Sequence, residues 1–307
     1  MKNTPSVCVL MNCYNSDKYL KEALDSVFAQ TYQSFEILFI DNQSTDQSSR
    51  IAQSYGEKVR YIRTPHHMTL YQARAFALDY VNTKYLAFLD CDDYWHPDKL
   101  KHQVGLMEKR SLDFVFGGAT LKIETHNKLR KFYYLIYIVS MRLVMALSRP
   151  SFQTVIDQLK SYSINLQTVM LRTEKLGAVR FDSKLNLLGD FLFFILLGAK
   201  RQVRYFYDPK VVSTTRVHDS QLSRKSAKAW VDEAQYCLMG PLNDVLNLEE
   251  KRAFRKIRSS YRANALFEEG RVKDAMKIKS HLKFLKGTFF LNWFKLSLRG
   301  FLNRKTA

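Results

Sequence analysis

Apolar residues in the first part of the chain follow two different spacings in turn. Short, unbroken apolar runs are typical of buried strands, and they alternate with segments in which apolar residues recur every three or four positions, as in amphipathic helices. The predicted strands are residues 6–12, 35–41, 59–64 and 84–90. The predicted helices are residues 16–30, 44–55, 69–81 and 97–110. This alternation predicts an α/β fold with a Rossmann-like, mostly parallel sheet and helices on both faces.

Local signals mark where these helices begin. Ser16 is expected to cap the first helix, and Ser44 and Gln47 have the spacing of a capping box before the second. Pro97 fits the first turn of the fourth helix, where a missing N–H costs no hydrogen bond.

The middle of the chain is less regular. Residues 128–162 are basic and aromatic and are predicted to be helical. Residues 165–172 are predicted to form a strand, and residues 203–218 are predicted to be mostly extended.

Helices dominate the predictions for the last third. A buried helix is expected over residues 188–200, starting near Asp190 and ended by Gly198. From Ala227 onward the chain is predicted to be helical, as a C-terminal extension, and Gly270 is expected to end one helix before the next begins.

The charge of the chain narrows the range of partners. A formal net charge of +19 over 307 residues implies an anionic partner, which is a nucleic acid, an anionic lipid surface or a phosphorylated substrate. From Arg271 to the last residue, ten basic residues stand against one acid. Residues 288–305 place Lys295 and Arg299 on one helical face with apolar residues around the remainder, which favours a helix lying on anionic lipid. A helix packed on the catalytic domain or on a second subunit is the alternative.

Cysteine spacing and hydropathy indicate in which cellular compartment the protein is expected. The four cysteines form no C-x-x-C pair and no zinc-binding spacing, so we expect reduced thiols in a reducing compartment. The most apolar stretch, residues 132–147, contains Arg142 and is shorter than the roughly 20 apolar residues of a spanning helix. These features predict a cytoplasmic protein without a transmembrane segment.

Polar residues follow the predicted strands at one end. Asn12, Asp41 and Asp90 each end a strand, and ligands of parallel sheets bind beyond the carboxyl ends of the strands. Asp90, Asp92 and Asp93 lie close enough in sequence to repel one another. Hard oxygen ligands of this kind suit Mg²⁺ or Mn²⁺, and an acidic cluster at the N-terminus of the next helix is the equally weighted alternative.

Four ordered segments resemble one enzyme family. SVCVLMNCYNSDKYLKEALDSVFAQTYQSFEILFIDNQSTD (6–46) resembles the opening of family 2 glycosyltransferases, which have the GT-A fold. LYQARAFALDYVNTKYLAFLDCDDYWHPDKL (70–100) resembles their Ala-Arg helix and Asp-x-Asp strand. VMLRTEKLGAVRFDSKLNLLGDFLFFILLGAK (169–200) is similar to their acceptor-side segment, and STTRVHDSQLS (213–223) to their Arg-x-His…Ser element. The resemblance runs through roughly two thirds of the chain.

The resemblance implies roles for individual residues at the donor site. The implied donor-binding residues are Asn12, Cys13, Tyr14, Asn15, Asp41, Asn42, Arg74, Asp90 and Cys91. Among them, Asp41 and Asn42 fall where the family bonds the uracil imide. Asp92 is the implied metal ligand, and His218 is expected to complete the metal shell. Three of these residues have a simpler structural interpretation. Tyr14 could be a core aromatic, Arg74 part of a surface ion pair, and His218 a structural imidazole.

Asp190 stands where the family places its catalytic base, and its alternative is a simple helix cap. The family usually has Glu immediately before this Asp, whereas Gly189 stands here. The Gln-x-x-Arg-Trp element of processive synthases is absent from the sequence, which favours addition of a single sugar.

Together these features predict an inverting glycosyltransferase that uses Mn²⁺ or Mg²⁺ and a nucleotide sugar, expected to be a UDP-sugar. The acceptor is expected to be a glycan or a lipid-linked glycan, and the enzyme to be peripheral on the inner face of the cytoplasmic membrane. We expect residues 1–125 to bind the donor, residues 126–226 to bind the acceptor and residues 227–307 to form a basic helical extension. Three alternatives remain: a nucleotidyltransferase, a catalytically inactive sugar-binding subunit, and a nucleic-acid-binding protein, although no nucleic-acid motif accompanies the charge.

Overall fold

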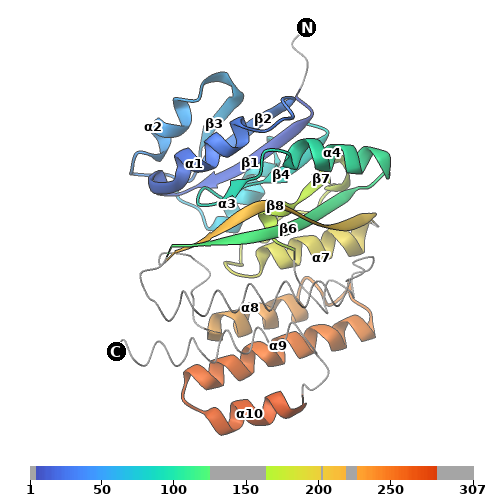
Figure 1. Ribbon diagram of the computed structural model, residues 1–307. Coiled ribbons are helices and arrows are strands. Elements are labelled where there is room, and N and C mark those ends of the chain that lie inside the picture. The colour runs from blue at the N-terminus through green and yellow to red at the C-terminus, as the bar shows by residue number, and fades with distance from the viewer. Residues whose placement is uncertain (1–4, 125–163, 202, 219–226, 282–307) are drawn as a thin grey trace. The chain divides into compact units, whose positions relative to one another are not determined.

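The structure is a computed structural model that describes residues 5–124, 164–201, 203–218 and 227–281 (Figure 1). The chain divides into two compact units. The first comprises residues 1–122 and 163–216, and the second comprises residues 123–162 and 217–307. The functional division predicted from the sequence, at residues 125 and 226, stays a prediction.

The described part of the chain forms one sheet of eight strands, in the order β3-β2-β1-β4-β7-β6-β8-β5. The strands are β1 (Val7–Cys13), β2 (Phe35–Asp41), β3 (Val59–Arg63), β4 (Tyr85–Phe88), β5 (Tyr94–Trp95), β6 (Phe114–Ile123), β7 (Met170–Arg172) and β8 (Tyr205–Val217). Strands β3, β2, β1 and β4 run parallel, as the sequence predicts. Beyond β4 the pairing turns antiparallel, so the sheet as a whole is mixed.

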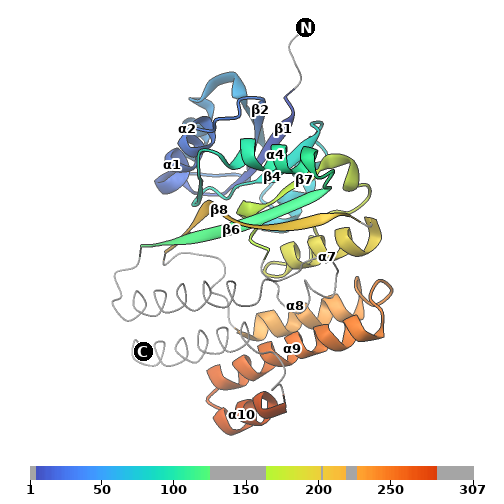
Figure 2. The same cartoon turned by 45° about the vertical axis from the view of Figure 1, so that its right-hand side comes forward.

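Helices cover both faces of this sheet, which confirms the predicted α/β architecture (Figures 1 and 2). The helices of the first unit are α1 (Asp17–Phe28), α2 (Ser48–Gln53), α3 (Leu70–Leu78), α4 (Lys99–Lys109) and α7 (Gly189–Arg201). Side chains of α1, α2 and α4 share one hydrophobic cluster with alternate residues of β1 and β2. Helices α3 and α7 lie on the opposite face.

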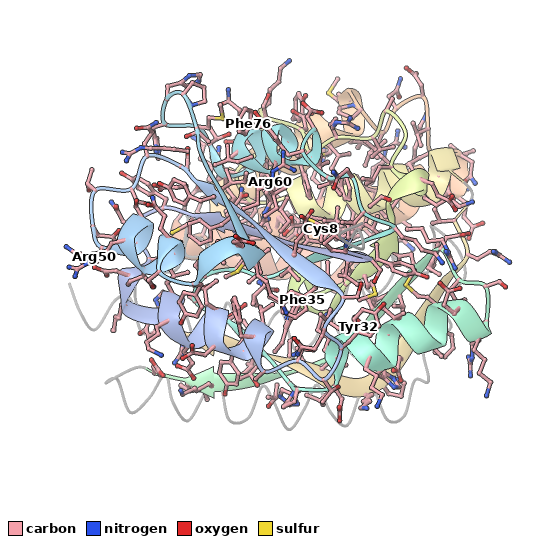
Figure 3. All side chains as sticks on the ribbon, turned by 90° about the horizontal axis from the view of Figure 1, so that it is seen from above. Cys8, Tyr32, Phe35, Arg50, Arg60 and Phe76 are labelled. Carbon is pink, nitrogen blue, oxygen red and sulfur yellow. The ribbon has the colours of Figure 1, made fainter. Side chains whose placement is uncertain are left out.

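Alternation along the strands separates the two sides of the core. Val7, Val9 and Met11 point into the cluster under α1, whereas Cys8 lies on the α3 side. Figure 3 shows Cys8 in the packed interior, while Arg50 reaches the edge of the molecule from α2. All four cysteines are buried and unbridged.

Ser16 occupies the N-cap position of α1, as predicted, but its side chain makes no capping hydrogen bond. Its hydroxyl donates to the Tyr14 carbonyl at 3.2 Å, and the carboxylate of Asp46 accepts from the Asp17 N–H at 3.0 Å. The predicted capping box at Ser44 is wrong. Ser44 does not cap α2, because its own N–H is held by the end of β2 in a tight turn and the helix starts several residues later. A side chain from a later loop therefore replaces the Ser16 side chain at α1, whereas a local turn after β2 keeps Ser44 out of α2.

Other differences lie in the second half of the first unit. Strand β6 was not predicted. Within the predicted strand 165–172, only β7 is extended, since residues 166–168 form a 3₁₀ turn, η2 (Leu166–Thr168). Gly198 does not end α7, which continues to Arg201. Helix α4 begins at Lys99 and not at Pro97.

The second unit contains α8 (Ala227–Met239), α9 (Leu248–Glu268) and α10 (Val272–His281). Gly270 has φ of 81° between α9 and α10, and the Arg271 N–H donates to the Leu266 carbonyl at 2.9 Å. This confirms the predicted glycine cap. Of the helices that the structure describes, none combines the length and apolar character needed to cross a membrane. The helices predicted over residues 128–162 and 288–305 lie outside the described residues.

Candidate active site

The carboxyl ends of β1, β2 and β4 meet at one edge of the sheet. Cys13 pairs with Asp41 in the parallel register of β1 and β2, and Leu10 pairs with Phe88 in that of β1 and β4. Asp90 therefore lies beside the end of β1. The sheet brings together the strand ends on which the predicted donor site depends.

A buried arginine joins two of the predicted site carboxylates. Arg74, 2% exposed, donates from Nη2 to Asp90 Oδ1 at 2.6 Å and from Nη1 to Asp190 Oδ1 at 2.7 Å. The guanidinium also lies against the rings of Tyr71 and Phe181, with its carbon 5.5 and 5.9 Å from their centroids. Helix α3 thus holds the turn after β4 and the start of α7 together.

Charge and burial oppose each other in this cluster. Burial disfavours the charged guanidinium, but the carboxylates of Asp190 and Asp90 outweigh it and raise the pKa of Arg74. Burial raises the pKa of Asp190, against the lowering effect of Arg74. Burial also raises the pKa of Asp90, again against Arg74. A carboxylate with a raised pKa is a stronger proton acceptor when ionised.

Asp90 has a further partner that the sequence analysis missed. Gln167 donates from Nε2 to Asp90 Oδ2 at 2.5 Å, so both oxygens of this carboxylate are bonded to side chains. The available signal was the one amide side chain between Leu166 and Met170, beside apolar residues that predict burial, because a buried polar side chain needs a partner.

The acidic turn is fixed from β8. Asp93 is buried, and its Oδ1 accepts from the Arg216 N–H at 2.7 Å. The Arg216 side chain donates from Nε to the Asp92 carbonyl at 2.9 Å and from Nη2 to Glu22 at 2.5 Å. Burial, with the nearby carboxylates, raises the pKa of Asp93 well above its usual range. Asp93 therefore anchors the turn, and Arg216 ties it to α1.

The three acidic side chains can bring oxygen atoms to one point. Carboxylate oxygens of Asp90, Asp92 and Asp93 lie within 4.8 Å of one another. Such a set of hard oxygen donors fits Mg²⁺ or Mn²⁺, both of which accept carboxylate ligands together with phosphate oxygens and water. Among the described residues, this is the one group of three potential ligands that meets this distance.

Asp41 and Asn42 are engaged within the protein. Asp41 accepts from the Ser44 N–H at 2.8 Å and from the Tyr61 hydroxyl at 2.5 Å. The Asn42 amide donates to the Met68 carbonyl and accepts from the Met68 N–H, both at 2.8 Å. Their predicted contact with a nucleobase stays a prediction, and their observed contacts shape the loops after β2.

The end of β1 offers groups toward a ligand. Asn12 Oδ1 is buried with no hydrogen-bond partner among the described residues. Tyr14 is 51% exposed and its ring centroid lies 4.4 Å from that of His67. Asn15 has a positive φ of 48°, and its Oδ1 accepts from the Thr45 N–H at 2.8 Å. The loop after β1 is thus joined to the loop after β2 through Asn15 and to the loop after β3 through Tyr14.

Cys91 and His218 are the two remaining predicted residues. Cys91 is buried, and its thiol donates to the Asn12 carbonyl at 3.2 Å, so it links β1 to the acidic turn. His218 follows β8 directly and belongs to the second unit. The donor-binding role of Cys91 and the metal-binding role of His218 stay predictions.

Steric crowding by Tyr71 explains why a glycine stands immediately before Asp190. A Cβ atom at Gly189 would lie 2.4 Å from carbons of the Tyr71 ring. That ring is buried and stacks on Phe181 at a centroid distance of 6.0 Å. Tyr71 thus occupies the space that a side chain at position 189 would need, one helical turn before Arg74 on α3.

We expect Gly189→Ala to lower the free energy of unfolding by about 1–3 kcal/mol, because the new methyl group overlaps a ring that has no free space. Thermal or urea unfolding of the two proteins measures the difference. Tyr71→Ala should remove the overlap, so the double variant should be less destabilised than the sum of the two single variants. Additive losses would show that the contact does not restrict position 189.

The sequence of this chain is similar to those of known glycosyltransferases. The profile of the family described as "Glycosyl transferase family 2" matches residues 8–168. TuaG of Bacillus subtilis, named for teichuronic acid biosynthesis, is 31% identical over 182 residues, which are 58% of this chain and 67% of TuaG. The Escherichia coli enzyme WfgD, a UDP-Glc:alpha-D-GlcNAc-diphosphoundecaprenol beta-1,3-glucosyltransferase, is 30% identical over 113 residues. That match covers 36% of this chain and 45% of WfgD, so this chain matches less than half of that relative.

Solved structures share the fold at low identity. S. aureus TarS 1–349 in complex with UDP-GlcNAc has a TM-score of 0.59 and 17% identity, over 95% of this chain and 90% of that one. The mannosyltransferase PcManGT from Pyrobaculum calidifontis, in complex with GDP-Man and Mn²⁺, has a TM-score of 0.60 and 15% identity, over 98% of this chain and 86% of that one. These likenesses confirm the predicted GT-A fold.

Proposed function

This chain belongs to glycosyl transferase family 2, and from that membership we propose that it moves one sugar from a UDP-sugar to a hydroxyl group of a glycan or lipid-linked acceptor, with inversion. The observation that carries the proposal is the Arg74 bridge between Asp90 and Asp190. This bridge supports Asp190 as a proton acceptor, because it holds Asp190 beside Asp90 at the end of β4. Parallel sheets bind nucleotides at such strand ends.

In the proposed reaction, the acceptor hydroxyl attacks the anomeric carbon while the bond from that carbon to the diphosphate oxygen breaks. The leaving group departs as a nucleoside diphosphate, and the hydroxyl proton goes to Asp190. Arg74 orients the Asp190 carboxylate through the 2.7 Å hydrogen bond. A single in-line displacement inverts the anomeric carbon, and no covalent intermediate on the protein is needed.

The proposed cation is Mn²⁺ or Mg²⁺, held by Asp92 with His218 as the predicted further ligand. When bound, such a cation offsets charge on the departing diphosphate. Asp90 and Asp93 hold the turn that carries Asp92, because both are bonded to other parts of the protein. The fit rests on the three carboxylates that converge within 4.8 Å.

Nucleobase binding is proposed at the end of β1. The imide N–H of uracil needs an acceptor, and Asn12 Oδ1 is a buried acceptor without a partner among the described residues. The exposed ring of Tyr14 offers a face for stacking. TarS was solved with UDP-GlcNAc and PcManGT with GDP-Man, so the choice of uridine rests on this chain's own residues.

The acceptor and the location are proposed from the relatives and the surface charge. TuaG is named for teichuronic acid and WfgD for a diphosphoundecaprenol-linked acceptor, and we extend that class of cell-envelope glycan to this chain. An acceptor of this kind would place the enzyme on the inner face of the cytoplasmic membrane.

Helix α9 offers a surface for such a membrane contact. Arg252, Arg255, Lys256 and Arg262 are exposed on one face of the helix. Each would add about 1 kcal/mol of attraction to an anionic surface. Co-sedimentation with anionic vesicles should therefore fall as salt is raised, and salt-independent binding, or none, would contradict the membrane proposal.

A panel of UDP- and GDP-sugars with Mn²⁺, read by the nucleotide released, tests the function. We expect release of UDP from a UDP-sugar, increased by a lipid-linked glycan acceptor. Release of pyrophosphate in a parallel assay with UTP and a sugar 1-phosphate would indicate a nucleotidyltransferase, and no release from any donor would favour a catalytically inactive sugar-binding subunit.

A further inference from the structure

Four side chains form a continuous polar chain through the site: Gln167, Asp90, Arg74 and Asp190. Their successive hydrogen bonds measure 2.5 Å from Gln167 to Asp90, 2.6 Å from Arg74 to Asp90 and 2.7 Å from Arg74 to Asp190. Gln167 is 6% exposed and Arg74 is 2% exposed, so water offers neither of them many alternative partners. Asp190 stands at one end of this polar chain and Gln167 at the other.

We propose that Gln167 is a positioning residue that fixes the orientation of the Asp90 carboxylate and, through Arg74, that of Asp190. This inference rests on the proposed function, because it assigns Asp190 the role of base. Without the Gln167 donor, one oxygen of Asp90 loses its partner in a mostly buried position, and the carboxylate is free to rotate about its terminal bond. The Arg74 guanidinium then loses one of the two fixed acceptors between which it lies.

The backbone that carries Gln167 is itself held unusually firmly. Three consecutive carbonyls accept from three side chains of the β5–α4 region. The Gln167 carbonyl accepts from Trp95 Nε1 at 2.9 Å. The next two carbonyls accept from Gln103 Nε2 at 2.7 Å and from Lys99 Nζ at 3.3 Å.

The three side chains supply hydrogen-bond donors that a short turn cannot provide for its own carbonyls. The 3₁₀ turn η2 ends here, and the last carbonyls of a helical turn have no partners within it. Burial lowers the pKa of Lys99 well below its usual range, and its amine donates a hydrogen bond in either protonation state. The side chain of Gln167 therefore projects toward Asp90 from a rigid base, as positioning requires.

Glutamine suits this position because it is a neutral donor. A lysine would supply a second cation and compete with Arg74 for Asp90, and a glutamate would place a third carboxylate beside Asp90 and Asp190. An apolar side chain would leave Asp90 Oδ2 without this donor.

The test compares Gln167→Met with Gln30→Met. Methionine keeps the length of glutamine but has no N–H donor. Both variants remove one buried amide, since Gln30 is buried and bonds the Ser26 and His96 carbonyls, but only Gln167 contacts Asp90. With the donor that the wild type turns over, we expect kcat of Gln167→Met to fall by about ten- to a hundredfold, with KM for the donor within about threefold of wild type. Gln30→Met should keep kcat within about threefold.

Equal losses of kcat in the two variants, or wild-type kcat in Gln167→Met, would overturn the inference and leave the proposed function standing. Absence of nucleoside diphosphate release by the wild type would overturn the proposed function instead. If Gln30→Met does not fold, Thr83→Val replaces it, because Thr83 is buried and its hydroxyl bonds the Tyr85 carbonyl, away from the site carboxylates.

A second measurement needs no activity. Unfolding of Gln167→Met, Asp90→Asn and the double variant forms a cycle that isolates the contact between the two side chains. We expect the two substitutions to be non-additive by about tenfold in the unfolding equilibrium constant, within the range seen for directly bonded residues. Additive effects would show that the hydrogen bond between Gln167 and Asp90 does not hold either group.

Discussion

Asp190→Asn is expected to lower kcat by about two to four orders of magnitude while leaving donor binding nearly unchanged. Asparagine keeps the shape of the side chain and an oxygen that can accept from Arg74, but it cannot take the proton of the acceptor hydroxyl. Steady-state release of nucleoside diphosphate in the presence of acceptor measures the loss. A variant that keeps its turnover and changes only in stability would show that Asp190 is a helix cap.

The pH profile should change with the same substitution. Burial raises the pKa of Asp190, and only the ionised carboxylate accepts a proton, so wild-type kcat should rise with pH through that raised pKa. Asp190→Asn should lose this limb of the profile. Asp113→Asn is the matched control, because Asp113 is also buried and paired, with Arg204 and Lys175, outside the site. It should lose stability but keep both kcat and the pH profile.

Asp92→Ala is expected to abolish detectable transfer and to weaken donor binding, with a loss of at least a hundredfold in kcat/KM. The proposed reason is that diphosphate charge is left without a compensating cation once the predicted ligand is gone. Titration of Mn²⁺ against activity, with and without EDTA, measures the dependence. Full activity of Asp92→Ala in excess EDTA would contradict a cation at this turn.

Asp98→Ala is the control for that substitution. Asp98 is exposed six residues further along the chain, where it accepts from the Thr31 hydroxyl at 2.9 Å. Its removal lowers the local negative charge by the same amount but takes nothing from the acidic turn. Transfer and its Mn²⁺ dependence should therefore stay as in the wild type.

Much of the candidate site at the ends of β1, β2 and β4 could be predicted from short stretches of sequence. A buried parallel strand is a continuous apolar run, so β1 to β4 and the polar residues that end them were recognisable without long-range information. A cation site at Asp90, Asp92 and Asp93 could also be predicted locally. Their close spacing in the sequence brings like charges together, and a cation would offset the repulsion.

Helix ends were harder to predict, because local and tertiary partners compete for the same groups. Ser16 has the right residue type for a cap, yet Asp46 from the next loop bonds the N–H of Asp17. Gly198 lies within α7, where surrounding apolar residues are buried against the sheet. In both cases packing outweighs a preference of about 1 kcal/mol.

The sequence by itself determined which residues stand at the strand ends, which segments are apolar, and that Gly189 departs from its family's pattern. Only the tertiary structure decided which partners meet. Gln167 lies 77 residues from Asp90, Arg74 lies 116 residues from Asp190, and the Arg216 N–H that holds Asp93 comes from 123 residues away. The physical reason is that strand and helix periodicity depends on neighbours within a few positions, whereas these contacts depend on the order of strands in the sheet. That order placed β7 beside β4, so that Gln167, just before β7, reaches Asp90, just after β4.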